Sequence, residues 1–155
     1  MAPDGRAWHE AGHALAAHLL GGVIREVTLE SEHDAFEAHV AVEWERTDPA
    51  NDARRFATVA LAGPVAELTF RGEEVLDDPK VFAAWSADWD ECSAQLERLE
   101  RRPEERDVLR HEILRELHAR FDEPVTYEQL ARIADALDAH ETLDETLFAD
   151  ALGLD

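Results

Sequence analysis

The sequence predicts a mainly helical α+β domain with a small antiparallel β-sheet or hairpin near its N-terminus. Segments of helix length with apolar residues at helical spacing occupy most of the chain, whereas two short segments alternate apolar and polar residues as strands do. Both strand-like segments precede residue 46. The 155 residues are 45% apolar and show no repeat or linker, so we expect residues 1–155 to form a single domain.

The segment 6–20 is expected to form the first helix, because it is dense in apolar residues. Pro3 and Asp4 are suitable starting residues, and Gly21-Gly22 ends the pattern. So many apolar residues indicate a helix that is largely buried rather than one with a broad exposed face.

Two strands are expected next. The segments 23–30 (VIREVTLE) and 38–45 (AHVAVEWE) alternate apolar and polar residues, as half-buried strands do. A polar turn around Ser31 to Asp34, which includes His33, joins them. The connection is short enough for the two strands to pair antiparallel.

The rest of the chain is predicted to be helical. A long helix over 51–70 should be kinked or broken at Gly63-Pro64, because proline lacks a backbone donor and clashes with the preceding turn. Thr126 with Gln129, and Thr142 with Glu145, match capping boxes that would start the last two helices. The other expected ranges are 79–85, 88–101, 104–121, 127–139 and a final helix that ends near Leu152.

The charge and the single cysteine limit the classes of function. A net charge of -21 argues against binding to nucleic acid or to an anionic membrane surface, both of which require basic patches. Cys92 is alone, so no intrachain disulfide is expected, and its helical position favours a buried core thiol. We find neither a signal-peptide pattern nor about 20 consecutive apolar residues, and we therefore expect a cytoplasmic protein without a membrane span.

The most informative motif is HExxH at residues 9–13 (HEAGH). Positions i and i+4 of a helix lie one above the other, so His9 and His13 can bind one metal ion. Glu10 then lies beside the ion, where a carboxylate can take a proton from metal-bound water. Imidazole and carboxylate groups in so apolar a helix are costly unless a partner satisfies them, and a metal ion would do so.

A catalytic zinc site needs a third protein ligand and leaves its fourth position for water. The sequence offers Glu67 after the segment 61–66 (LAGPVA), and two aspartates, Asp88 and Asp90, where a new helix is expected to begin. Helical phase favours Asp88, because Trp89, Cys92 and Leu96 then occupy the buried positions that follow it on the same helix.

Four segments resemble, in the same order, motifs in the peptidase domain of the FtsH-type ATP-dependent zinc metalloproteases. Residues 9–15 (HEAGHAL) match that family's HEAGHAL helix, and residues 61–68 (LAGPVAEL) are similar to its LGGRAAEEL segment. Residues 86–89 (SADW) lie where the family has GASND, and residues 137–143 (LDAHETL) are similar to its LLExETL close. The resemblance spans nearly the whole chain.

The resemblance implies a zinc site with an aspartate as the third ligand. Spacing from the family's small residue favours Asp90, whereas helical phase favours Asp88, which we prefer. The resemblance places Glu67 near the zinc, where it would orient an imidazole rather than bind the ion, although direct ligation by Glu67 stays open as an alternative.

This chain also departs from the family. Residues 1–155 contain no GxxxxGK[ST] phosphate-binding loop, so we expect neither the ATPase module nor the membrane anchor of the family, and Pro64 replaces the arginine of the family's GGR. Unfolding and threading of folded substrates depend on the motor, so we expect peptides or unfolded protein as substrates. The resemblance also allows a homo-oligomer or a separate ATPase as a partner.

The leading hypothesis is therefore a zinc metalloendopeptidase, a hydrolase that acts without ATP, with zinc on His9, His13 and Asp88 and with Glu10 as the base. The alternative is a non-catalytic zinc-binding domain for protein interaction or regulation. A third hypothesis, an acidic decoy for basic proteins, rests on charge alone and leaves the HEAGH motif unexplained. Among the other histidines, His39 opens the second strand and could approach the cleft, whereas His18, His111 and His118 fit surface or packing positions.

Overall fold

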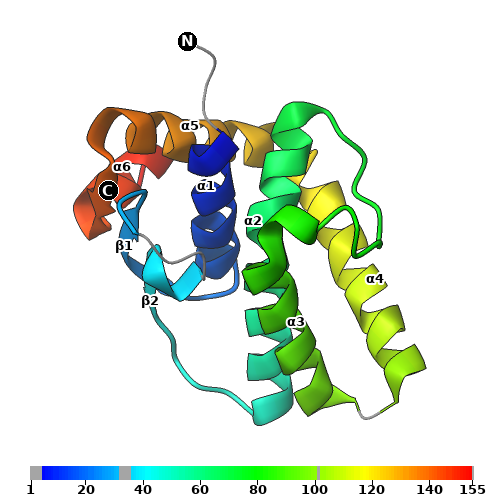
Figure 1. Cartoon of the computed structure of the whole chain (residues 1–155). Coiled ribbons are helices and arrows are strands. Elements are labelled where there is room, and N and C mark those ends of the chain that lie inside the picture. The colour runs from blue at the N-terminus through cyan, green and yellow to red at the C-terminus, as the bar shows by residue number, and fades with distance from the viewer. Residues whose placement is uncertain (1–4, 32–35, 101, 155) are drawn as a thin grey trace.

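Helix α1 (Gly5–Leu19) lies at the centre of the fold, between α2 (Pro49–Arg71) and α5 (Pro124–His140) (Figure 1). The computed structural model describes residues 5–31, 36–100 and 102–154. Within these residues it contains six α-helices and a three-stranded antiparallel sheet, which confirms the predicted mainly helical α+β class. The other helices are α3 (Ser86–Leu99), α4 (Pro103–Phe121) and α6 (Glu145–Leu152), and short 3-10 turns are η1 (Phe36–Ala38) and η2 (Ala83–Trp85).

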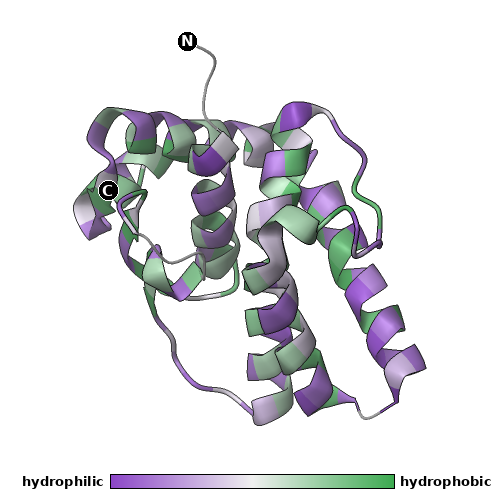
Figure 2. Ribbon diagram, in the orientation of Figure 1, coloured by the Kyte–Doolittle hydropathy of each residue, from purple (hydrophilic) through white to green (hydrophobic). Residues whose placement is uncertain are grey.

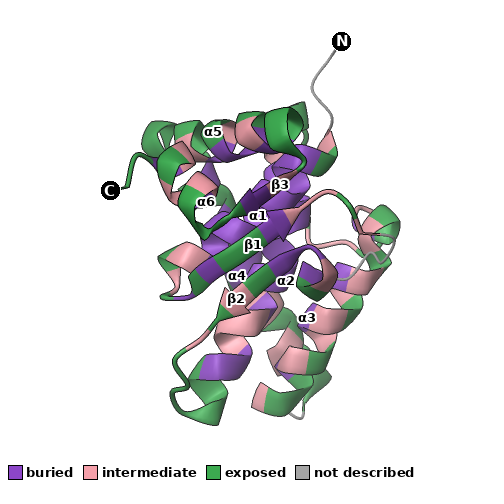
Figure 3. Cartoon of the chain, turned by 90° about the vertical axis from the view of Figure 1, so that its left-hand side faces the viewer, coloured by how far each residue is buried: buried purple, intermediate pink, exposed green. Residues whose placement is uncertain are grey.

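Residues 7–17 of α1 are all buried, as the dense apolar pattern predicts (Figure 3). Close packing against α2 depends on Gly12, because a Cβ atom at that position would lie 2.4 Å from the carbonyl oxygen of Ala62. The outer helices α4 and α5 alternate hydrophilic and hydrophobic residues, consistent with one face on the core and one in water (Figure 2). Because α1 is buried between these layers, the polar residues of its HEAGH motif lie inside the molecule.

The sheet has the strand order β2-β1-β3. Strands β1 (Val23–Thr28) and β2 (Val40–Glu43) pair antiparallel, as predicted. The third strand, β3 (Thr142–Asp144), pairs with β1 on its other side and comes from the C-terminal part of the chain. A three-residue strand is too short for an alternation pattern to identify, and the prediction of a sheet built only from the N-terminal part was incomplete.

The long helix is not broken at Gly63-Pro64, so that part of the prediction is wrong. Helix α2 continues through Pro64 and ends at Gly72, which adopts a left-handed conformation with φ of 68°. An internal proline costs a helix about 3 kcal/mol. The buried residues on both sides of Pro64 pack against α1 and α3, and this tertiary packing offsets the local cost.

Three further boundaries differ from the predictions. The segment 79–85 contains only the short turn η2 rather than a helix. Helix α5 begins at Pro124, so Thr126 is a buried residue inside the helix and not its cap, because proline favours the first helical turn. The last helix is capped by Asp144, whose side chain accepts from the backbone N–H of Leu147, instead of by Thr142.

Some predicted features lie outside the described residues: the helix start at Pro3-Asp4 and most of the turn around Ser31 to Asp34, with His33. The helix expected to reach Arg101 ends at Leu99, and Glu100 is already extended. Among the helices that the structure describes, none is long and apolar enough to cross a membrane.

Candidate metal centre

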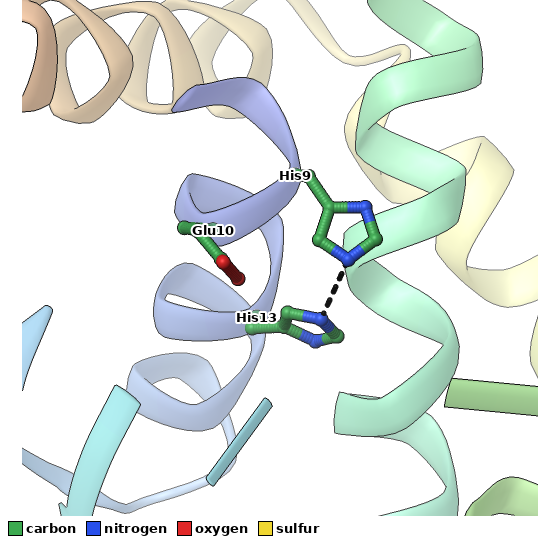
Figure 4. A group of neighbouring side chains, drawn as sticks. All are labelled: His9, Glu10 and His13. Carbon is green, nitrogen blue, oxygen red and sulfur yellow. Dashed lines mark hydrogen bonds between the residues drawn. The ribbon is translucent and has the colours of Figure 1, made fainter. Parts of the chain in front are cut away.

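The two imidazoles of the HEAGH motif lie one turn apart on the buried face of α1 (Figure 4). The Nε2 atoms of His9 and His13 are 3.1 Å apart. Ligand atoms of His9, Glu10 and His13 all lie within 4.8 Å of one another, and all three residues are buried. The helical spacing of the motif therefore produces the convergence that the sequence predicts.

Asp88 joins the two imidazoles from the first turn of α3. Its Oδ2 atom lies 2.8 Å from His9 Nε2 and 3.4 Å from His13 Nε2, and the residue is only 2% exposed. Asp88 shares its buried face with Cys92 and Leu96, one and two turns later, whereas Asp90 is exposed. Of the two candidate aspartates, the structure brings Asp88 to the imidazoles, as helical phase favours.

The three converging atoms lie close to the spacing that a tetrahedral ion requires. Ligand atoms about 2.0–2.2 Å from a tetrahedral zinc ion lie about 3.4 Å from one another. The observed separations among His9 Nε2, His13 Nε2 and Asp88 Oδ2 are 3.1, 2.8 and 3.4 Å. Each pair would need to separate by at most about 0.6 Å to hold such an ion.

Two buried carboxylate oxygens provide a second test of fit. Asp88 Oδ1 and Glu10 Oε1 are inaccessible to water and have no hydrogen-bond partner among the described residues. Leaving buried polar atoms unsatisfied costs about 1–3 kcal/mol each, and more for charged groups. A divalent cation beside the two carboxylates would reduce this cost, and a donor set of two histidines and one aspartate suits zinc.

The neighbours of His13 fix the tautomer of its ring. Its Nδ1–H donates to the carbonyl oxygen of Val59 at 2.7 Å, so the neutral ring carries its lone pair on Nε2. The ring is fully buried, and it lies directly against Gly63, where a Cβ atom would be 2.3 Å from Nε2. Gly63 is therefore the residue that makes room for this ligand.

Glu67 contacts the opposite side of the His9 ring. Its Oε1 lies 3.4 Å from His9 Nδ1, and its carboxylate also forms an ion pair with Arg71. Burial alone would raise the pKa of Glu67, but His9 and Arg71 together lower it below its usual value. This position suits a group that orients the imidazole, and it lies on the other edge of the ring from the nitrogen that faces Asp88.

Carboxylates on both edges make His9 strongly basic. Burial lowers the pKa of His9, but its contacts with Asp88 and Glu67 outweigh burial and raise the pKa to about 9. Burial likewise opposes ionisation of Asp88, yet the two imidazoles lower its pKa to about 2. The Nε2 atom of His9 therefore faces both Asp88 Oδ2, at 2.8 Å, and His13 Nε2, at 3.1 Å.

The site opens into a cleft of about 250 Å³, whose lining includes His9, Glu10, Asp88, Trp85 and His39. His39 follows η1 and precedes β2, and its Nδ1 atom lies 3.0 Å from Glu10 Oε2. The sequence placed His39 at the start of a strand, and no motif connected it with Glu10. The contact depends on the pairing of β1 with β2, which local spacing does not reveal.

The remaining candidates lie away from the centre. The ring of His18 packs against Phe148, and His111 and His118 are exposed. Cys92 is buried in the core, and this burial raises the pKa of its thiol to about 12. These positions fit the structural roles that the sequence analysis favours.

No protein-family model matches the chain, and no curated protein matches it either. The resemblance to the FtsH-type peptidases therefore stays a prediction drawn from the motifs.

Proposed function

We propose that this chain is a zinc-dependent metalloendopeptidase, with a peptidase domain that resembles those of the FtsH-type proteases. The observation that carries the proposal is the approach of Asp88 to the two HEAGH imidazoles. Asp88 is separated from His9 by 79 positions in the sequence, yet its Oδ2 lies within 3.4 Å of both Nε2 atoms. His9, His13 and Asp88 are the residues that would hold the ion.

The chemistry of zinc and two residues of the chain support a catalytic rather than a purely structural site. A bound zinc ion supplies Lewis acidity, which lowers the pKa of a coordinated water to about 7 and polarises a carbonyl group. Glu10 lines the same cleft and offers a carboxylate that can accept a proton and deliver it to a leaving amine. Glu67 Oε1 lies 3.4 Å from His9 Nδ1, close enough for its carboxylate to orient the ring.

The proposed substrates are peptides or unfolded segments of protein. Hydrolysis at zinc with Glu10 as the base consumes no nucleotide, and residues 1–155 contain no GxxxxGK[ST] loop. A cleft of about 250 Å³ is small beside typical ligand pockets of about 300–1,000 Å³, which suits one extended segment better than a folded domain. A homo-oligomer or a separate ATPase could then deliver substrates that are folded.

The proposal is tested with purified protein loaded with zinc. We expect one zinc per chain by elemental analysis and cleavage of casein or of a fluorogenic peptide. Glu10→Gln should lower turnover by about 10²–10⁴-fold while the zinc content stays the same, because only the base is lost. Glu97→Gln, on the exposed face of α3, is the matched control and should keep full activity.

Full activity of Glu10→Gln would contradict the assignment of Glu10 as the base. Stoichiometric zinc without cleavage of any unfolded substrate would instead support the alternative of a non-catalytic zinc-binding domain. Failure to bind zinc at all would contradict both.

A further inference from the structure

The His39 side chain is held rigidly against strand β1. Its backbone carbonyl accepts from the N–H of Thr28 at 2.8 Å, and its backbone N–H donates to Phe36 at 2.9 Å. The ring adds a third bond, from Nδ1–H to the carbonyl oxygen of Thr28 at 2.8 Å. The residue is 7% exposed, so its ring has little freedom to move.

Both contacts of the Nδ1 atom require it to carry a proton. The carbonyl oxygen of Thr28 can only accept, and Oε2 of the Glu10 carboxyl group, 3.0 Å away, offers lone pairs to the same N–H. The Nδ1–H form is therefore fixed whether the ring is neutral or charged. A protonated nitrogen cannot coordinate a metal, so this edge of His39 acts as a donor to Glu10.

The two oxygens of Glu10 are thereby made different. Oε2 lies against His39 Nδ1, whereas Oε1 is buried without a hydrogen-bond partner in the part of the chain that the structure describes. A glutamate has three rotatable side-chain bonds, and holding one oxygen removes most of this freedom. Because a general base must lie within hydrogen-bond reach of the proton that it takes, this restriction bears directly on catalysis.

We propose that His39 is a positioning residue for the proposed peptidase reaction: it holds Oε2 of Glu10 and leaves Oε1 as the oxygen that accepts the proton. The inference rests on the proposed function, since it assigns the orientation of the base in that reaction. It adds a group from the segment between η1 and β2 to a centre otherwise built from helices α1, α2 and α3.

The kinetic test compares His39→Leu with His39→Asn. The two replacements are nearly equal in size, but the amide nitrogen of asparagine occupies the position of Nδ1 and keeps the donor. We expect His39→Leu to lower kcat by about 10- to 100-fold with little change in KM, because a misplaced catalytic group costs about that much. His39→Asn should recover most of kcat, and both variants should keep one zinc per chain.

A second measurement needs no turnover. Nitrogen NMR of the histidine rings should show His39 in the Nδ1–H form, and Glu10→Ala should shift the His39 Nδ1 signal because it removes one of the two acceptors. The thermal unfolding of each variant is measured alongside, so that a loss of folded protein is not mistaken for a loss of positioning.

The outcomes separate the two proposals. If the wild-type protein cleaves substrate and His39→Leu is equally active, the role of His39 is overturned and the peptidase proposal stands. The role of His39 is also overturned if His39→Asn does not recover the lost kcat. It is overturned as well if the His39 Nδ1 signal is unchanged in Glu10→Ala. A wild-type protein that binds zinc but cleaves nothing overturns the peptidase proposal and the catalytic role of His39 together, while the NMR result still decides whether His39 holds Glu10.

Discussion

Replacing Gly63 by alanine should displace His13 and impair the metal centre. The added Cβ atom would lie 2.3 Å from His13 Nε2, 2.6 Å from Cε1 and 2.7 Å from Cδ2, where ordinary contacts begin at 3.4 Å. The ring would have to withdraw by about 1.1 Å, which is several times the ±0.2 Å tolerance of a metal-ligand distance. Its hydrogen bond to Val59, at 2.7 Å, and its full burial oppose such a movement.

Gly63→Ala has two opposing effects on the stability of the folded protein. Overpacking of a core costs about 1–3 kcal/mol, whereas alanine stabilises a helix interior by about 0.5–1 kcal/mol relative to glycine. We therefore expect Gly63→Ala to lower the free energy of unfolding of the zinc-free protein by up to about 2 kcal/mol. Zinc affinity should fall by at least 10- to 100-fold, the range known for the loss of a group that merely orients a ligand.

Two assays measure these effects: urea unfolding of the zinc-free protein, and competition for zinc with a chelator of known affinity. A double-mutant cycle identifies the cause. In a His13→Ala background the clash is absent, so Gly63→Ala should be neutral or stabilising by up to about 1 kcal/mol. A Gly63→Ala protein that binds zinc as tightly as the wild type would refute the reasoning.

Three further predictions follow from the same contacts. Asp88→Asn should weaken zinc binding in the chelator assay while Asp90→Asn leaves it unchanged, because Asp90 is exposed on the same helix; equal losses would contradict the ligand assignment. In the zinc-free protein, the pKa of His9 is raised from 6.5 to about 9, so its stabilising contribution is complete below pH 6.5 and is lost as the pH rises towards 9. The urea midpoint should therefore fall over this interval, and a fall of the same size in His9→Gln would rule out His9 as its source. The buried Cys92 thiol, with its pKa raised to about 12, should react with a thiol reagent only on unfolding, and rapid reaction of the folded protein would contradict this.

Much of the fold could be predicted because its signals are local. The apolar density of α1, the alternation in β1 and β2, and the phase of α3 each lie within one short segment. The continuity of α2 through Pro64 was not predictable in this way, since packing of α2 against α1 and α3 offsets a local penalty. The same holds for β3, which is only three residues long and becomes a strand through its pairing with β1.

The candidate site likewise has parts that local sequence predicts and parts that depend on tertiary packing. The HEAGH spacing predicts the pair of imidazoles, and helical phase predicts which aspartate approaches them, because both are properties of single helices. The contact between His39 and Glu10 joins a residue that precedes β2 to one on α1, 29 positions earlier in the sequence. No sequence pattern indicates this contact. The role of Gly63 was also missed, because the space it leaves for His13 is a property of how α1 and α2 pack.

The most direct measurement is a crystal structure of the zinc-loaded protein with anomalous data collected at the zinc edge. We expect a single strong peak about 2.0–2.2 Å from His9 Nε2, His13 Nε2 and a carboxylate oxygen of Asp88. A zinc ion held elsewhere, or one that reaches the two imidazoles without Asp88, would contradict the metal centre on which every functional assignment depends.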